Sequence, residues 1–179
     1  MSDQQIGKRG EERIYLAHFT EAYRLATGKN LLVGDGPDSP DFIGVRETGE
    51  EIAVELTCIM RNPASAQAAE ILWRQEYMDA DEALELIYHT IEIKEEKRVK
   101  DYGIWADKTI LVINLVECPL SSLLPDLNTL QGDFNFHGFV KVWLADHSDD
   151  AYSDIELSGL SPLEIWGYYP RPPGQKPYG

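Results

Sequence analysis

Residues 108–116 read KTILVINLV, a nearly continuous apolar run. A strand of this kind is typical of a sheet that is covered on both faces, because its side chains point alternately to the two faces and both sets must leave water. The chain has 179 residues, of which 43% are hydrophobic, and this is enough for one domain with a sizeable core. We therefore expect an α/β fold in which helices flank a central β-sheet.

Hydrophobic periodicity predicts the remaining elements, in an order without internal repeats. Gly28 ends the first helix, and Gly49 allows the tight turn of a hairpin. An aspartate in the segment MDAD is expected to cap a long helix. The predicted elements are a helix over about 8–26, strands over 31–33, 41–46 and 51–59, a helical segment after 61–65, a helix over 82–102, and strands over 108–116 and 138–146.

The other segments carry weaker signals. Residues 119–135 are predicted to be loop with at most a short helix. We expect residues 1–168 to form a single domain. The proline-rich segment 169–179 is expected to be an extended or disordered tail.

The charge of the chain limits its partners. There are 31 acidic and 16 basic residues, and the resulting formal charge of -15 repels a polyanion at long range. Any contact with nucleic acid must therefore come from a local basic strip, a divalent metal or a partner protein. No run approaches the roughly 18 apolar residues of a membrane span, and the polar residues 1–10 do not resemble a secretory signal. We expect no membrane contact and a cytoplasmic location.

Two carboxylates interrupt the predicted hairpin SPDFIGVRETGEEIAVELT at 39–57. Asp41 follows Pro40 at the start of one strand, and Glu55 lies inside the next. Charged side chains are rarely buried in a sheet unless they are paired or bind a metal, and carboxylates are the hard oxygen ligands that Mg²⁺ prefers. The alternatives are that Asp41 is a turn residue and that Glu55 faces solvent from an edge strand.

This motif and the predicted order of elements resemble the core of the PD-(D/E)XK superfamily of restriction-endonuclease-like nucleases. The resemblance covers roughly residues 10–116 and implies a mixed central sheet with elements in the order αβββαβ, plus additions. It also implies that Asp41 and Glu55 bind Mg²⁺, or Mn²⁺ in its place. The backbone carbonyl of Leu56 is a further ligand in the superfamily pattern.

The first helix supplies a third carboxylate. Members of the superfamily often complete the metal site with a glutamate from this helix. Glu12 precedes Tyr15 and Phe19 by three and seven residues, so it lies on the apolar side and is the first choice. Glu11 is the competing choice. The alternative is that both glutamates only interact favourably with the helix dipole.

The sequence departs from the superfamily pattern at Thr57, where the motif lysine would stand. Threonine carries no charge and cannot replace a cation that acts on the water or the phosphate. Some members carry the lysine on the following helix, and IEIKEEKRVKDY at 91–102 resembles that arrangement. At about 100° per residue, Lys94 falls on the apolar arc of this helix, so it is the first choice and Lys97 the second. The alternative is that both belong to a solvated, charged helix surface.

Together these features predict a Mg²⁺-dependent phosphodiesterase that acts on nucleic acid, with DNA as the expected substrate. In this interpretation Asp41 and Glu55 hold the metal, Glu12 assists, and Lys94 is the cation. The alternative is a non-catalytic binding or regulatory module that kept the nuclease fold, which the missing motif lysine and the negative charge favour. Both interpretations are compatible with a protein partner or a homodimer.

Overall fold

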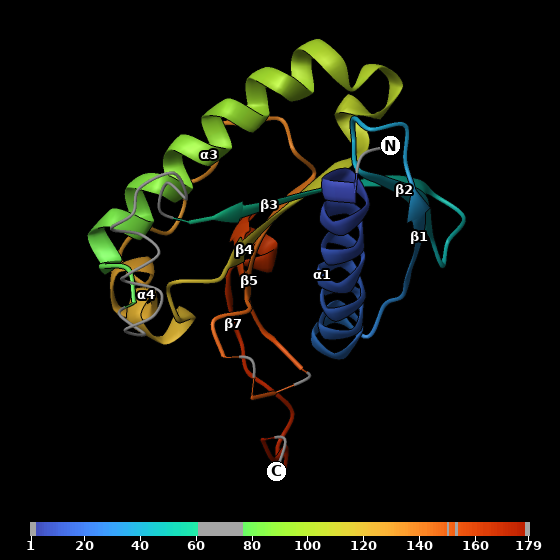
Figure 1. The fold of residues 1–179 in the computed structure, drawn as a ribbon. Coiled ribbons are helices and arrows are strands. Elements are labelled where there is room, and N and C mark those ends of the chain that lie inside the picture. The colour runs from blue at the N-terminus through green and yellow to red at the C-terminus, as the bar shows by residue number, and fades with distance from the viewer. Residues whose placement is uncertain (1–2, 61–76, 150, 153, 178–179) are drawn as a thin grey trace.

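One seven-stranded sheet organises the chain, and its strands lie side by side in the order in which they occur in the sequence (Figure 1). The computed structural model describes residues 3–60, 77–149, 151–152 and 154–177. The strands are β1 (Leu31–Asp35), β2 (Phe42–Arg46), β3 (Glu51–Ile59), β4 (Thr109–Leu115), β5 (Lys141–Asp146), β6 (Glu156–Ser161) and β7 (Gly167–Tyr169).

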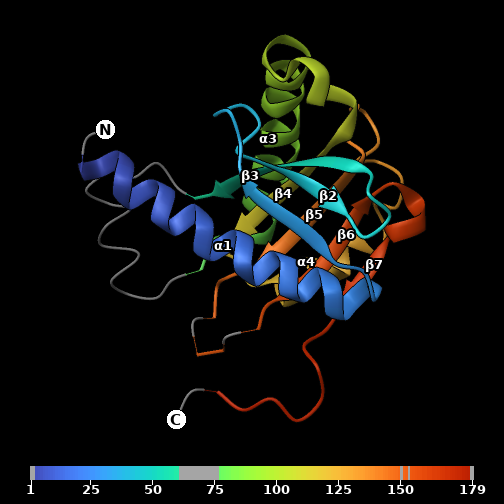
Figure 2. The same cartoon turned by 90° about the vertical axis from the view of Figure 1, so that its right-hand side faces the viewer.

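The sheet is mixed, as predicted. Strands β1, β2 and β3 are antiparallel neighbours, β3, β4 and β5 run parallel, and β5, β6 and β7 are again antiparallel. Parallel neighbours require a crossover, and these crossovers contain α3 (Ala80–Asp101) and α4 (Leu120–Leu127). α1 (Asp3–Thr27) covers the opposite face (Figure 2). Two short 3-10 helices, Gly103–Lys108 and Leu163–Ile165, precede β4 and β7.

β4 is the strand that the apolar run predicted, and all seven of its residues are buried. Ile110 and Val112 belong to the hydrophobic cluster beneath α1. Leu111 and Ile113 point the other way, into the cluster beneath α3 and α4. The prediction of a strand buried on both faces is confirmed, and the sheet is the middle layer of three.

The two long helices each bury one side against the sheet. α1 has 25 residues, of which Leu16, Phe19 and Tyr23 are buried. α3 has 22 residues, of which Ile87 and Ile91 are buried. Within the described ranges, no helix is long and apolar enough to cross a membrane.

Helix α3 begins where the sequence predicted a cap. Asp79 accepts the backbone N–H of Asp81 at 2.8 Å, which confirms the predicted aspartate cap. The helical segment predicted before this cap lies in 61–76, outside the described residues. The first helix already includes Asp3, several residues before the predicted start.

The C-terminal part of the sheet was not predicted. β6 and β7 follow the last predicted strand and extend the sheet by two antiparallel strands. Tyr169, the first residue of the predicted tail, is the last residue of β7, and its ring centroid lies 5.4 Å from that of Trp143. The proline-rich segment therefore begins inside the sheet. In 119–135, where a short helix was allowed, the structure has α4.

The close approach of β1 and β2 predicts a selective effect of alanine at Gly44. A Cβ there would lie 2.0 Å from the carbonyl oxygen of Leu32 and 2.7 Å from Cα of Val33, so the two strands must separate. We expect Gly44→Ala to lower the free energy of unfolding by about 1–3 kcal/mol.

The matched control is Gly34→Ala on the neighbouring strand, where a Cβ meets nothing within 4 Å. We expect this variant to stay within about 0.5 kcal/mol of the wild type in urea unfolding. Equal effects of the two substitutions would contradict the described packing of β1 on β2.

Candidate active site

The candidate site lies where β2 stops pairing with β3. The antiparallel register ends with Phe42 opposite Val54, and no described strand pairs with β3 on that side beyond this point. The N–H of Leu56 therefore lacks a strand partner there, and the carboxylate of Asp41 accepts it at 2.9 Å. In return, Oε2 of Glu55 accepts the backbone N–H of Asp41 at 3.2 Å. Each carboxylate therefore accepts a hydrogen bond from the backbone of the segment that carries the other carboxylate.

Glu55 is fully buried, with 0% of its side chain exposed. Its neighbours Val54 and Leu56 pack beneath α1, so the alternation of the strand directs Glu55 toward α3. There its Oε1 accepts hydrogen bonds from Nζ of Lys94 at 2.6 Å and from Nζ of Lys97 at 2.9 Å. The alternative that Glu55 faces solvent from an edge strand is therefore wrong.

The two lysines make Glu55 a stable anion. Burial raises the pKa of Glu55, but the charges and hydrogen bonds of Lys94 and Lys97 outweigh burial and lower it overall. The side chains of Lys94 and Lys97 are 18% and 32% exposed, so both belong to the interior of the site more than to a solvated helix surface. Nζ of Lys97 also lies 5.6 Å from the ring centroid of Tyr102, within cation–π range.

The pKa of Asp41 is shifted in the opposite direction from that of Glu55. Burial and the negative charges of Glu55 and Glu12 raise its pKa to about 6, although the Leu56 N–H and the charge of Lys94 act against this. One carboxylate of the pair is therefore satisfied as an anion and the other is not. Opposite pKa shifts in adjacent carboxylates are typical of functional sites.

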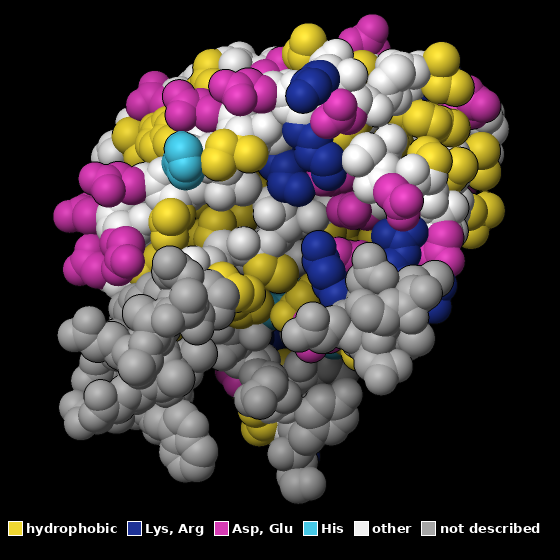
Figure 3. Space-filling model, turned by 45° about the horizontal axis from the view of Figure 1, so that its top comes forward, with side chains coloured by type: hydrophobic (Ala, Val, Ile, Leu, Met, Phe, Trp, Pro, Cys, Tyr) yellow, Lys and Arg dark blue, Asp and Glu magenta, His cyan; other side chains and the backbone are white. Residues whose placement is uncertain are grey.

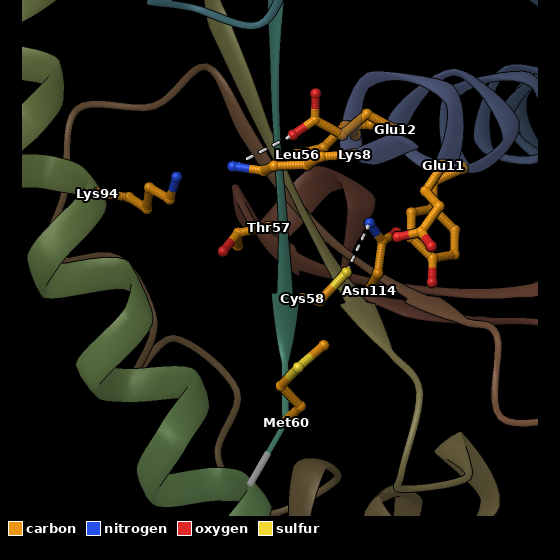
Figure 4. Close-up of a pocket in the computed structure, with 10 residues that line it drawn as sticks. Lys8, Glu11, Glu12, Leu56, Thr57, Cys58, Met60, Lys94 and Asn114 are labelled. Atoms are coloured by element: carbon orange, nitrogen blue, oxygen red, sulfur yellow. Dashed lines mark hydrogen bonds and ion pairs between the residues drawn. The ribbon is translucent and has the colours of Figure 1, made fainter. Parts of the chain in front are cut away.

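Glu12 and Glu11 of α1 lie toward different parts of the site. Glu12 is 17% exposed and forms long ion pairs with Lys8, at 3.7 Å, and with Arg9, at 3.5 Å. Its charge contributes to the raised pKa of Asp41. Glu11 instead lies on the side of Cys58, whose pKa its charge helps to raise (Figure 4). The structure thus brings Glu12, and not Glu11, to the carboxylate pair.

A pocket of about 240 Å³ lies along this edge of β3, between α1 and α3 (Figure 4). Lys8, Glu11 and Glu12 line it from α1, Thr57 from β3 and Lys94 from α3. The side chains of Thr57 and Lys94 both face the space between β3 and α3. Thr57, which stands where the motif lysine would be, and Lys94 on the following helix therefore line the same pocket.

The donor chemistry of this site suits a hard divalent cation, because carboxylate oxygens are the ligands that Mg²⁺ prefers. Across the described part of the chain, however, no three or more His, Cys, Asp and Glu side chains are arranged as a metal site. The oxygens of Glu55 are instead hydrogen-bonded to Lys94, Lys97 and the Asp41 backbone. An ion that binds Oε1 of Glu55 must therefore displace a lysine, whereas Oε2 accepts one hydrogen bond from the described residues and keeps a free lone pair.

Sequence reasoning missed three residues of this region. Arg9 donates from Nη2 to the carbonyl of Asp41 at 3.0 Å and fixes the start of β2. Tyr102 was predicted only as an apolar position, yet burial and the charge of the nearby Glu55 raise its pKa. Lys8 lines the pocket, and its spacing of four residues from Glu12 is the one signal that could have identified it.

Comparisons with known proteins add no relative. No protein-family model, no curated protein and no solved structure matches this chain. The functional argument therefore depends on the geometry of the site.

The buried ion pairs predict that Glu55→Gln destabilises the protein. Glutamine keeps the size of the side chain but leaves two ammonium groups without a counter-charge, and we expect a loss of about 1–3 kcal/mol in the free energy of unfolding. Urea unfolding in chelator would measure it. The control is Glu51→Gln on the same strand, where Glu51 pairs with Lys108 at 2.6 Å on the surface. There we expect less than about 1 kcal/mol, and equal losses would contradict a stabilising role of the buried pair.

The raised pKa of Asp41 predicts a pH-dependent effect of Asp41→Asn. Because the pKa is about 6 in the folded protein and about 4 in the unfolded chain, ionisation of Asp41 lowers the stability of the wild type as the pH rises through this window. Asparagine cannot ionise but can still accept the Leu56 N–H. In metal-free buffer the stability of the variant relative to the wild type should therefore rise between about pH 4 and 6, by at most about 3 kcal/mol, and stay constant above. A difference that does not change with pH would contradict the raised pKa.

Proposed function

We propose that this protein is a Mg²⁺-dependent phosphodiesterase that acts on nucleic acid, with DNA as the expected substrate. The observation that carries the proposal is the fully buried Glu55, which lies beside Asp41 and meets the ammonium groups of Lys94 and Lys97 at 2.6 and 2.9 Å. A carboxylate pair with an adjacent cation is what metal-assisted hydrolysis of a phosphodiester requires.

The arrangement of elements supports a restriction-endonuclease-like core. The described elements α1, β1, β2, β3, α3 and β4 follow the order αβββαβ that the resemblance implies. The carboxylates come from the start of β2 and the middle of β3, and the lysines from the helix after them. The further strands β5, β6 and β7 extend the sheet away from the site.

In this proposal Asp41, Glu55, Glu12 and the carbonyl of Leu56 hold the ion. When bound, Mg²⁺ would supply an activated water and neutralise the charge that develops on the phosphate. Residues of the chain position the ligands: Arg9 bonds to the backbone carbonyl of Asp41 and the Leu56 N–H to its carboxylate, and these bonds hold Asp41 beside Glu55. Glu55 keeps its negative charge in the interior because α3 carries cations against it.

Lys94 takes the place of the motif lysine. Its side chain shares the pocket with Thr57, so a cation delivered from α3 reaches the region that a lysine at position 57 would reach from β3 (Figure 4). In catalysis the ammonium of Lys94 would act on the water or on a phosphate oxygen. Lys97 is more exposed and lies against the ring of Tyr102.

A non-catalytic module is the second candidate, and one observation favours it. The lysines neutralise Glu55 without an ion, and the Asp41 carboxylate accepts the Leu56 N–H. In that case the ion pairs fasten α3 to the sheet, and a binding partner would use another surface. The formal charge of -15 favours a partner other than bare nucleic acid.

Cleavage assays on DNA separate the two candidates. The wild type should cleave with Mg²⁺ or Mn²⁺ and not in chelator. Asp41→Asn and Glu55→Gln should each lower the rate at least about 100-fold, since each removes a charge that the ion requires. Glu51→Gln is the matched carboxylate control and should cleave at the wild-type rate. Activity that persists in chelator would overturn the proposal.

The displaced lysine gives a sharper test. Lys94→Met should abolish cleavage without abolishing Mn²⁺ binding, because the lysine acts in the transition state and the carboxylates hold the ion. Adding Thr57→Lys to this variant should restore part of the activity, since it returns a cation to the same pocket. A Lys94→Met variant that cleaves at the wild-type rate would refute the assigned role.

A further inference from the structure

Two lysines from different elements face the same pocket. Lys8 extends from α1 over the edge of β3, and Lys94 extends from α3 on the other side (Figure 4). Their ammonium ends point toward one another, and both residues line the pocket of about 240 Å³. Like charges directed into one space repel, so each ammonium group needs an anionic partner there.

Each of these lysines is paired with a carboxylate that the proposed function assigns to the metal. Nζ of Lys8 lies 3.7 Å from Glu12, and Nζ of Lys94 lies 2.6 Å from Glu55. An ion that binds Glu12 and Oε1 of Glu55 would remove the partner of both ammonium groups at once. The two cations would then be free for a second ligand in the pocket.

We propose that Lys8 and Lys94 form a two-cation seat for one backbone phosphate of the nucleic acid. The proposal rests on the proposed function and deepens it, because it assigns the phosphate to a defined place beside the carboxylates. Lys8 is 79% exposed, so it can reorient toward a phosphate without disturbing the core. Lys94 is only 18% exposed, so its ammonium stays within the pocket when it leaves Glu55.

This seat explains how a chain with a charge of -15 can bind a polyanion at this point. Figure 3 shows Lys and Arg side chains gathered near the middle of the face that includes this region, with acidic side chains around them. Glu11 and Glu12 line the pocket together with the two lysines, so its local charge becomes positive only when a divalent cation is bound, and salt screens the acidic residues beyond about 8–10 Å. The seat also couples the two ligands, because divalent metal and phosphate each favour the state in which the lysines have left the carboxylates.

The test is the binding of a fluorescently labelled DNA duplex, followed by anisotropy with Ca²⁺ present and at several salt concentrations. Lys8→Met should raise the Kd about 3- to 10-fold and reduce the slope of log K against log salt by about 0.9, the value for one lost phosphate contact. The control is Lys29→Met, an equal change in charge at an exposed lysine just beyond the other end of α1, about 30 Å along the helix axis. It should leave both quantities unchanged.

The coupling gives a second readout. Ca²⁺ should tighten DNA binding by the wild type more than it tightens binding by Lys8→Met. Equal weakening of DNA binding by Lys8→Met and by the control Lys29→Met would overturn the seat. A wild-type protein that does not bind the duplex would overturn it as well. DNA that binds in a Lys8-dependent way without being cleaved in Mg²⁺ would instead refute the phosphodiesterase and keep the seat. Cleavage that is insensitive to Lys8→Met would keep the phosphodiesterase and refute the seat.

Discussion

A single carboxylate with no exposed surface, that of Glu55, sets the conditions that the surrounding structure has to meet. An isolated charge in the interior would cost several kcal/mol, so it must have partners. α3 provides them with Lys94 and Lys97, and the start of β2 provides the N–H of Asp41. The charge of Glu55 therefore links α3 and the start of β2 to the centre of β3, in addition to the apolar packing of α3 on the sheet.

The pair of carboxylates is asymmetric, and the asymmetry supports the proposed metal site. Glu55 has two cationic partners and a lowered pKa, whereas burial and the neighbouring negative charges raise the pKa of Asp41 to about 6. A purely structural ion pair would not need Asp41 in this position, because an asparagine could accept the Leu56 N–H equally well. A carboxylate kept at an electrostatic cost is a typical feature of a site that is completed by a cation.

Much of the fold could be predicted because its signals are local. The apolar run of β4 and the hairpin of β2 and β3 follow from residue pattern and turn residues alone, and the position of Lys94 on α3 follows from helical spacing. β6 and β7 were missed because each contains a glycine and is followed directly by a proline, and both residues favour loops. Lys8 was missed because its spacing from Glu12 indicates only a pair on the helix surface, whereas its place in the pocket comes from the tertiary packing of α1 on β3.

The central claim is that the lysine-paired Glu55 belongs to a divalent-metal site that Asp41 completes. The most direct measurement is an anomalous difference map from crystals soaked in Mn²⁺, recorded above the manganese absorption edge. We predict one peak between the carboxylates of Asp41 and Glu55, with the ammonium of Lys94 moved from Glu55 toward the pocket. A map without a peak there, with Lys94 and Lys97 still bonded to Glu55 at saturating Mn²⁺, would contradict the account.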